Sequence, residues 1–297
     1  MSVGRITLLG GTGLIGRALS RRLVAAGLDV QVVSRHAEAA RDLPAGIRAR
    51  SADVRDRRAM RAALAGSDAA VYLPGRVQGR RRSDFAEIHR LAAQGCAICA
   101  REIGLSRFIF LSALGAAPDA SAWADQTKAE GEQSVAEEFP AAVVVRPSLV
   151  FGPRDHFRHQ MLGLMRRLPL LPVIGPATRV QPVHIDDLVE ALQRLLQARQ
   201  QHDRIVQAAG PRVWRLIDLL AALRDQARIR CRLLALPEWA ALMLAGAAAI
   251  LPNPPLSPDQ VRLMRSDKIA EPGIPQLADL GIRARDPMDE KTRLPGS

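Results

Sequence analysis

A glycine-rich turn lies near the start of the chain, directly between a short apolar segment and an amphipathic one. Residues 5–9 read Arg-Ile-Thr-Leu-Leu, and Gly10-Gly11-Thr12-Gly13-Leu14-Ile15-Gly16 follows at once. A G-x-x-G-x-x-G pattern in this position requires a tight turn from a buried strand into a helix that packs closely on that strand. The pattern therefore predicts that the chain opens with a βαβ unit of a parallel sheet.

The same alternation continues through the first half of the chain. Apolar segments of strand length and amphipathic segments of helix length follow one another, which is typical of an α/β fold with a doubly wound, parallel, Rossmann-type sheet. Strands are predicted over 6–9, 30–34, 47–52, 70–73, 108–111 and 143–146, and helices over 14–26, 56–65, 85–103 and 124–138. Gly27 and Gly104 stand where left-handed residues end two of these helices.

The second half is less regular because prolines punctuate it. We divide the chain into a nucleotide-binding Rossmann domain over residues 1–150 and a smaller, mainly helical C-terminal region over 151–297. Helices are predicted after Asp186-Asp187 and over 216–227, with a short strand at 205–207. We expect segments near 180–210 to return to the main sheet.

Composition narrows the class of partner. The chain has 297 residues, is 48% hydrophobic and 24% charged, and carries a formal net charge of +12. These values describe a globular chain, and the excess positive charge favours anionic partners such as a nucleotide, an anionic membrane surface or an acidic protein. Aromatic residues make up only 3%, which leaves few stacking platforms and argues against nucleic acid.

The cysteines and the first residues indicate the compartment. Cys96, Cys99 and Cys231 form no disulfide framework, which is typical of a reducing compartment, and the C-x-x-C spacing of the first two falls inside an apolar helical run that predicts packed thiols. We expect no metal site. A strand that begins at residue 5 leaves no room for a targeting segment, so we predict a cytoplasmic protein.

The glycines of the opening turn have separate roles in a dinucleotide site. Gly10 permits the tight turn, Gly13 lets the backbone approach a pyrophosphate, and Gly16 lets the helix pack on the strand. The helix N-terminus then presents free N–H groups and a partial positive charge to the phosphates. Further candidate cofactor residues in this segment are Thr12, Leu14 and Ile15.

The end of the second predicted strand indicates which dinucleotide is preferred. An NAD site usually carries Asp or Glu here, whereas this chain has Ser34, Arg35 and His36. A guanidinium can bind a 2′-phosphate through two hydrogen bonds and a hydroxyl can donate to it, so the sequence predicts NADP(H) over NAD(H). The alternative is that Arg35 is a solvated surface cation.

The ends of the third and fourth predicted strands supply the remaining contacts to the adenosine. Asp53 and Val54 close the third strand, and the Asp53 carboxylate can accept a hydrogen bond from the adenine amino group. Leu73, Pro74 and Gly75 close the fourth, where small residues let the backbone pass the adenosine and the pyrophosphate.

These residues, taken with several later motifs, resemble the extended and atypical short-chain dehydrogenase/reductase family. Within it, the chain is similar to the nucleotide-binding accessory subunits of respiratory complex I, through 146–155, 180–187 and a tail from Ser257. The resemblance implies cofactor contacts from Ser112, Lys128, Pro147, Ser148 and Val150. The motifs are Gly10–Gly16, Asp53-Val54, Phe110–Ala113, Thr127–Glu132, Arg146–Gly152 and Gln181–Asp187.

The chain departs from the family at the residue that protonates the substrate. The resemblance implies a catalytic Ser, Tyr and Lys, with the last two in a Y-x-x-x-K motif; Ser112 and Lys128 occupy two of the three positions, but Ala124 stands four residues before Lys128. Alanine cannot deliver the proton that hydride transfer to a carbonyl requires. Whether the chain is an enzyme therefore stays open, with Lys128 either an unconventional acid or a holder of the cofactor ribose.

Two further stretches are candidates for contact with a partner. The first is predicted to be a solvated basic loop, or one that contacts a nucleotide phosphate, an acidic partner or lipid headgroups. The segment Arg76–Arg82 carries four arginines after the fourth predicted strand, and Leu233–Leu251 is strongly apolar, with 13 uncharged residues from Trp239 onward. Such a run is shorter than the roughly 20 residues that span a bilayer. It predicts either a core helix or a helix that lies on a membrane or in a partner groove, followed by an extended connector at Pro252, Pro254, Pro255 and Pro258.

Three functions follow from the sequence. The first is an NADP(H)-binding protein whose nucleotide is structural or serves as a sensor, which by resemblance associates with complex I subunits at the inner face of the inner membrane. The second is an active NADPH-dependent reductase, epimerase or dehydratase acting on a small carbonyl compound or a nucleotide sugar. The third is a soluble NADP(H)-dependent regulator that binds a protein partner.

Overall fold

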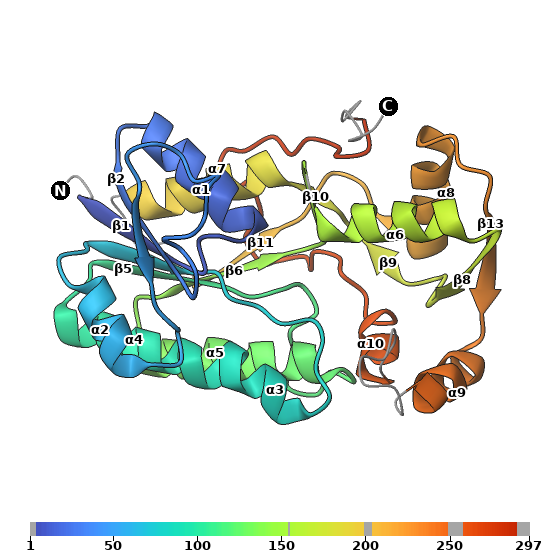
Figure 1. Ribbon diagram of the computed structural model, residues 1–297, viewed down its shortest axis with the longest axis horizontal. Coiled ribbons are helices and arrows are strands. Elements are labelled where there is room, and N and C mark those ends of the chain that lie inside the picture. Colours follow the sequence, from blue (N-terminus) through green and yellow to red (C-terminus); the bar gives the residue numbers. More distant parts are fainter. Residues whose placement is uncertain (1–3, 154, 199–203, 249–257, 290–297) are drawn as a thin grey trace.

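A seven-stranded parallel sheet lies at the centre of the molecule (Figure 1). The computed structural model describes residues 4–153, 155–198, 204–248 and 258–289. The strand order is β11-β6-β5-β4-β1-β2-β3, which confirms the doubly wound Rossmann-type sheet. Its strands are β1 (Arg5–Leu9), β2 (Asp29–Ser34), β3 (Arg48–Ser51), β4 (Ala69–Tyr72), β5 (Arg107–Leu111), β6 (Val143–Pro147) and β11 (Ile205–Ala208).

Helices cover both faces of this sheet, which explains why inner strands such as β4 and β5 are apolar on both sides. The helices α1 (Leu14–Ala25) and α7 (Ile185–Gln197) pack on one face, and α2 (Arg57–Leu64), α4 (Ala93–Ile103) and α5 (Trp123–Glu138) pack on the other. Cys96 and Cys99 are buried in α4 as free thiols, as predicted.

The long helix predicted over 85–103 differs from expectation. The helical run begins earlier, with α3 (Arg82–Ala86), and continues through the π-helical segment η1 (Glu87–Ala92) into α4. The wider π turn re-aims His89, whose ring bonds to the Arg76 backbone on one side and to Thr127 on the other. These partners are remote in sequence, so periodicity alone could not show the interruption.

The smaller region surrounds its own apolar core. It comprises α6 (His156–Arg167), α8 (Leu216–Gln226), α9 (Glu238–Ala248) and α10 (Pro258–Leu263), with three strand pairs. The pairs are β7 (Val150–Phe151) with β10 (Val183–His184), β9 (Arg179–Val180) with β12 (Trp214–Arg215), and β8 (Leu170–Ile174) with β13 (Arg232–Leu236).

The apolar stretch Leu233–Leu251 is not a single element. Its first residues belong to β13, and α9 begins only at Glu238, after Pro237. Pro258 was expected in the extended connector but is the first residue of α10, a position where a missing N–H costs nothing. The rest of the predicted connector, and residues 249–251, lie outside the described residues.

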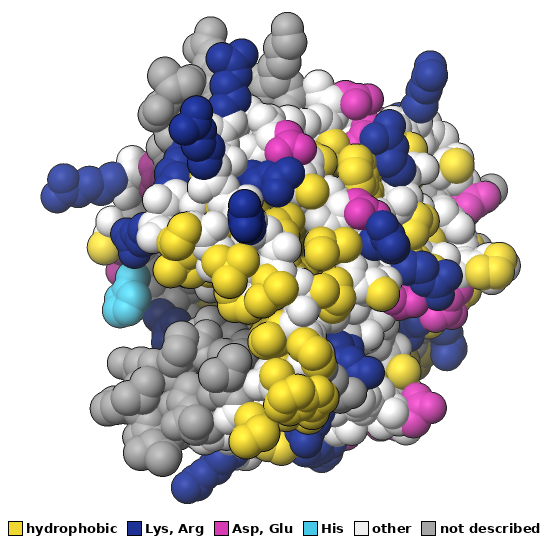
Figure 2. Space-filling view, turned by 90° about the vertical axis from the view of Figure 1, so that its right-hand side faces the viewer, with side chains coloured by type: hydrophobic (Ala, Val, Ile, Leu, Met, Phe, Trp, Pro, Cys, Tyr) yellow, Lys and Arg dark blue, Asp and Glu magenta, His cyan; other side chains and the backbone are white. Residues whose placement is uncertain are grey.

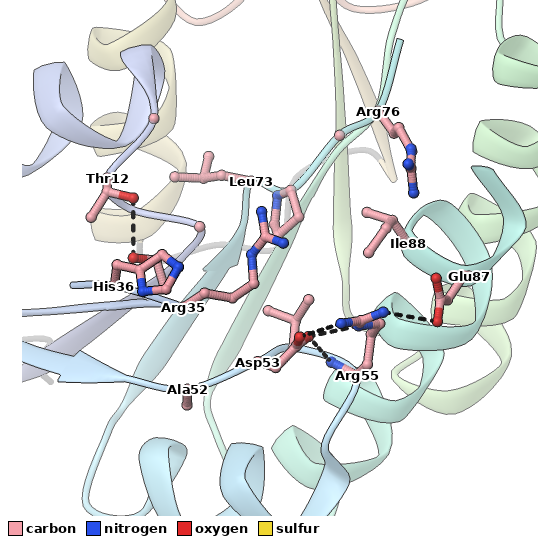
Figure 3. Close-up of a pocket in the computed structure, with 16 residues that line it drawn as sticks. Thr12, Arg35, His36, Ala52, Asp53, Arg55, Leu73, Arg76, Glu87 and Ile88 are labelled. Atoms are coloured by element: carbon pink, nitrogen blue, oxygen red, sulfur yellow. Dashed lines mark hydrogen bonds and ion pairs between the residues drawn. The ribbon is translucent and has the colours of Figure 1, made fainter. Parts of the chain in front are cut away.

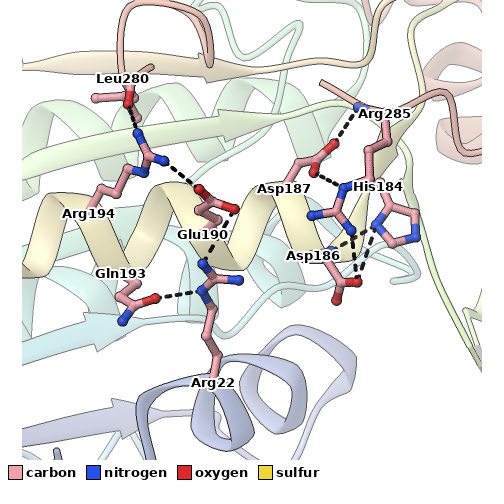
Figure 4. A network of polar contacts seen from close by, with 9 residues as sticks. All are labelled: Arg22, His184, Asp186, Asp187, Glu190, Gln193, Arg194, Leu280 and Arg285. Atoms are coloured by element: carbon pink, nitrogen blue, oxygen red, sulfur yellow. Dashed lines mark hydrogen bonds and ion pairs between the residues drawn. The ribbon is translucent and has the colours of Figure 1, made fainter. Parts of the chain in front are cut away.

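Side chains of α7 tie the C-terminal segment to the Rossmann domain (Figure 4). Glu190 pairs with Arg22 of α1 at 3.3 Å and with Arg194 at 2.6 Å, and Arg194 donates to the Leu280 carbonyl. Asp187, which is 1% exposed, accepts from the Arg285 backbone N–H at 2.7 Å. Charged contacts therefore connect α1, α7 and the C-terminal segment on the side of the sheet that α1 and α7 cover.

Two helical glycines provide a matched test of the packing between η1 and α5. A methyl group on Gly131 of α5 would lie 2.0 Å from the His89 carbonyl oxygen, whereas one on Gly95 of α4 meets nothing within 4 Å. We expect Gly131→Ala to lower the free energy of unfolding by about 1–3 kcal/mol, because η1 must move. Gly95→Ala should raise it by up to about 1 kcal/mol. Equal values in denaturant unfolding of the two variants would contradict this packing.

Candidate functional site

The turn between β1 and α1 has the geometry that binds phosphate. Gly10 adopts a left-handed conformation with φ 75°, and Gly13 is the N-cap of α1. A methyl group on Gly16 would lie 2.5 Å from the Gly11 backbone, so only glycine lets the helix pack this closely. The first turn of α1 contains no acidic residue. No carboxylate of this turn therefore neutralises the free N–H groups and the positive dipole end of α1, which remain available to an anion.

The ends of β2 and β3 bring charged side chains to the same edge of the sheet, because neighbouring parallel strands end together. Arg35 and Arg55 extend toward the same open space in Figure 3. Hydrogen bonds from the Arg55 guanidinium to Asp53, at 2.6 and 3.0 Å, lower the pKa of that carboxyl to about 2. The Ser34 hydroxyl accepts a hydrogen bond from Thr12 at 3.0 Å. Arg35 is exposed and makes no ion pair with any described residue.

The loop after β4 is held by a buried histidine. The Arg76 backbone N–H donates to His89 Nε2 at 2.9 Å, so the neutral ring carries its proton on Nδ1 and donates to the Thr127 hydroxyl, also at 2.9 Å. Burial, together with the charge of Lys128, lowers the pKa of His89 to about 3. The ring is therefore a fixed structural contact at neutral pH and not a proton donor to a ligand.

These segments enclose a pocket of about 630 Å³. Eleven of its lining residues were candidates from the sequence: Gly10, Thr12, Gly13, Ser34, Arg35, His36, Asp53, Val54, Leu73, Pro74 and Gly75. Five further residues line the pocket and are not among the predicted site residues, although Arg76 begins the basic loop for which contact with a nucleotide phosphate is one alternative: Ala52, Arg55, Arg76, Glu87 and Ile88. Arg55 and Arg76 each lie four residues beyond the end of a strand, in the loops after β3 and β4, whereas Glu87 and Ile88 arrive through the π turn.

The other candidates in the first helix do not line this pocket. Leu14 and Ile15 are half-buried and pack against the core between α1, α7 and the sheet, and Gly16 contacts Gly11. Their structural contribution is to hold the glycine turn against the sheet.

Ser112 follows β5, and Lys128 reaches the end of that strand from α5; neither residue lines the pocket. The Lys128 ammonium donates to the Leu111 carbonyl at 2.6 Å and lies 5.1 Å from the centre of the Phe110 ring. A methyl group on Gly75 would lie 3.8 Å from Lys128 Nζ, so the ammonium is directly behind the pocket wall. Burial lowers the pKa of Lys128 to about 8. The buried Ser112 hydroxyl has no hydrogen-bond partner among the described residues.

No tyrosine hydroxyl is available at this site. Ala124, at the expected tyrosine position, is buried in the first turn of α5. The chain's single tyrosine, Tyr72, lies fully buried in β4, donates to the Ile88 carbonyl at 2.6 Å, and has a pKa raised well above its ordinary value by burial.

The C-terminal segment covers the start of α5. Asp259 of α10 accepts a hydrogen bond from the Trp123 backbone N–H at 2.6 Å, and Lys268 pairs with the buried Asp125 at 2.6 Å. Both contacts flank Ala124. The C-terminal segment therefore fixes the two residues on either side of Ala124.

The remaining candidates lie away from the pocket. The Ser148 hydroxyl donates to the Lys268 carbonyl at 2.8 Å and accepts from the Gln181 N–H, so it joins strands to the C-terminal segment. The Pro147 carbonyl accepts from Leu114, and Val150 pairs with Val183. Their role in holding a cofactor stays a prediction.

The pocket suits a dinucleotide, whose pyrophosphate is anionic. It combines an uncapped helix N-terminus, a close backbone approach at Gly10 and Gly13, and guanidinium groups at Arg35, Arg55 and Arg76. The described residues include no group of three or more His, Cys, Asp or Glu side chains placed to hold a metal ion. Within those residues, no helix has the length and apolar character needed to cross a membrane.

Comparisons with known proteins agree with this geometry. Residues 10–148 match the protein family described as NAD(P)H-binding. The 40 kDa subunit of mitochondrial NADH-ubiquinone oxidoreductase from Neurospora crassa is 26% identical over 94% of this chain and 76% of its own length. Ceramide reductase from Caulobacter vibrioides is 31% identical over 64% of this chain and 60% of its own length. A nucleoside-diphosphate-sugar epimerase from Staphylococcus aureus shares the fold, with TM-score 0.77, 14% identity and coverage of 96% and 98%.

Reversing the charge at Arg35 tests the preference for the 2′-phosphate. We expect Arg35→Asp to lower the ratio of NADPH to NADH affinity at least tenfold, because a guanidinium–phosphate pair becomes a repulsive contact. Fluorescence titration with each nucleotide measures the ratio. The control is Arg230→Asp, an equally charged change at an exposed arginine in the C-terminal region. An unchanged ratio in Arg35→Asp would show that Arg35 is only a solvated cation.

The pKa of Lys128 predicts how nucleotide binding depends on pH. A bound dinucleotide favours the protonated ammonium, which the free protein loses as the pH rises through about 8. We therefore expect NADPH affinity to fall several-fold between pH 7 and pH 9.5, by at most about tenfold per pH unit. In Lys128→Met the affinity should be weaker at pH 7 and flat over this range. The same slope in both proteins would assign the titration to another group.

Proposed function

Since the chain is an NAD(P)H-binding protein with a short-chain dehydrogenase/reductase fold and is homologous to subunits of mitochondrial NADH dehydrogenase, we propose that it holds NADP(H) as a structural or sensing group. The observation that carries the proposal is the loss of the proton donor: Ala124 stands at the tyrosine position while Tyr72 is bonded inside the core. A site that binds the nucleotide without an acid retains it and does not turn it over.

The form of the nucleotide is NADP(H) in this proposal. Ser34 and Arg35 follow β2 where an NAD site carries an acidic side chain, and Arg55 adds a second cation beside them. Asp53 is engaged by Arg55, so it offers the adenine amino group an acceptor that stays ionised at neutral pH.

The partner in this proposal is the membrane-bound NADH:quinone oxidoreductase, at the inner face of the inner membrane. Support comes from homology over nearly the whole chain, which includes the C-terminal region and not the nucleotide domain alone. The net charge of +12 suits a protein that lies against anionic surfaces.

A second function has one observation in its favour. The unpartnered Ser112 hydroxyl and Lys128, with its pKa of about 8, lie together beside the pocket, as in a reductase that binds a carbonyl oxygen. In that case Ser112 would donate a hydrogen bond to the oxygen and Lys128 would give up the proton, while bound NADPH supplies the hydride. Because one relative is a ceramide reductase, a ceramide is the lipid to include among the substrates assayed.

Purification of the tagged protein from its native membranes tests the proposed function. We expect oxidoreductase subunits to co-purify and NADP(H) to be released on heat denaturation. Arg35→Asp should reduce the nucleotide content, and Arg283→Asp, the same change at an exposed arginine outside the pocket, should not. A protein that emerges alone in the soluble fraction, with steady NADPH-dependent reduction of an added ketone, would support the reductase instead.

A further inference from the structure

The end of the molecule farthest from β2 and β3 carries a small sheet with an uncovered outer face. In the parallel pair β8–β13, Leu170 stands opposite Arg232, and Pro172 stands opposite Leu234. These residues are exposed, whereas Leu171 and Val173, on the alternate positions of β8, are buried against the core of the C-terminal region. The sheet therefore presents an apolar outer surface on which no described residue packs.

The helix that follows continues this surface. Trp239 and Met243 of α9 are 68% and 70% exposed and lie one helical turn apart, so they point the same way. Ala241, between them, is fully buried and packs with Val261 and Ile174. The apolar face consists of Leu168, Leu170, Pro172, Leu234, Trp239 and Met243, and Figure 2 shows hydrophobic side chains running down this end of the molecule.

Arginines border the apolar face. They are exposed and take part in no ion pair among the described residues. The sequence contains no carboxylate from His156 to Gly175 or from Gln226 to Pro237. This basic rim consists of Arg166, Arg167, Arg228, Arg230 and Arg232, and basic side chains lie beside the apolar ones in Figure 2.

We propose that the apolar face and its basic rim dock on the surface of a membrane that contains anionic lipids. An exposed tryptophan and a row of apolar side chains bordered by unpaired guanidinium groups match the boundary between acyl chains and phosphate headgroups. Pro172 has no N–H to offer an added strand, which disfavours extension of this sheet by a partner protein. The inference rests on the membrane location in the proposed function and names the surface responsible, separate from the nucleotide pocket.

Co-sedimentation of the full-length, NADPH-loaded protein with lipid vesicles tests the proposal. We expect binding to vesicles of equal parts phosphatidylglycerol and phosphatidylcholine, little binding to phosphatidylcholine alone, and weaker binding when salt rises from about 50 to about 500 mM. Absence of binding to the anionic vesicles at the lower salt would overturn the proposal.

Two pairs of substitutions separate the apolar and the charged contributions. Trp239→Ser with Met243→Ser should reduce vesicle affinity at least tenfold, and Val77→Ser with Leu91→Ser, which changes exposed apolar residues elsewhere, should not. Arg166→Glu with Arg167→Glu should reduce it at least tenfold, at roughly fivefold per lost cation before the added repulsion. The control pair is Arg21→Glu with Arg58→Glu, both exposed on the Rossmann domain. NADPH titration of each variant verifies that it is folded.

The outcomes also distinguish this proposal from the function it extends. Suppose that the variants of the apolar face and of the basic rim bind vesicles as well as their controls do. That result would overturn the lipid-docking surface while leaving nucleotide retention and co-purification intact. Loss of co-purification in the patch variants without any vesicle binding would assign the face to a protein partner and overturn the proposal. Vesicle binding by a protein that never co-purifies with the oxidoreductase would support the surface and contradict the proposed partner.

Discussion

The close approach of α1 to the turn after β1 is the contact on which the rest of the structure depends. Gly16 lies so near the Gly11 backbone that no side chain fits between them, and this places the uncapped N-terminus of α1 at the carboxyl edge of the sheet. Since neighbouring parallel strands end at the same edge, the side chains that follow β2, β3 and β4 converge on that helix end. The pocket is thus lined by groups from separate segments, as a site for one dinucleotide requires.

The same frame normally supports hydride transfer, and a few contacts distinguish this chain from that use. Ala124 removes the proton donor, and Asp259 and Lys268 bond to the residues on either side of it. Tyr72 cannot substitute, because its hydroxyl is bonded to a backbone carbonyl inside the sheet–helix core. Ser112 and Lys128 keep positions that would suit catalysis, yet Lys128 also holds its charge beside the pocket wall, where it can stabilise a bound nucleotide. The proposal that the nucleotide is held without turnover rests on these contacts.

Local sequence signals were enough to predict the sheet and the glycine turn. Strands β1, β2 and β4 and helix α1 lie within one residue of their predicted bounds. Their ends are set by apolar runs and glycines, which are signals that depend on residues close in sequence. The misses have long-range causes. The π turn at His89 depends on Arg76 and Thr127, the exposure of Trp239 depends on which side of α9 meets α10, and Glu87 enters the pocket only through that π turn. Arg55 was missed although it pairs with a residue two positions away, because side-chain direction at a strand end is not encoded by periodicity.

The central claim is that this chain binds NADP(H) and does not use it. The most direct measurement is a time course of near-ultraviolet absorbance for the NADPH-loaded protein, with quinones, ketones including lipid ketones, and nucleotide sugars each added in excess. The account predicts that the nucleotide stays bound and reduced over hours. Its oxidation should be no faster than in Lys128→Met. Sustained oxidation through many turnovers with any of these compounds, abolished in Lys128→Met, would contradict it.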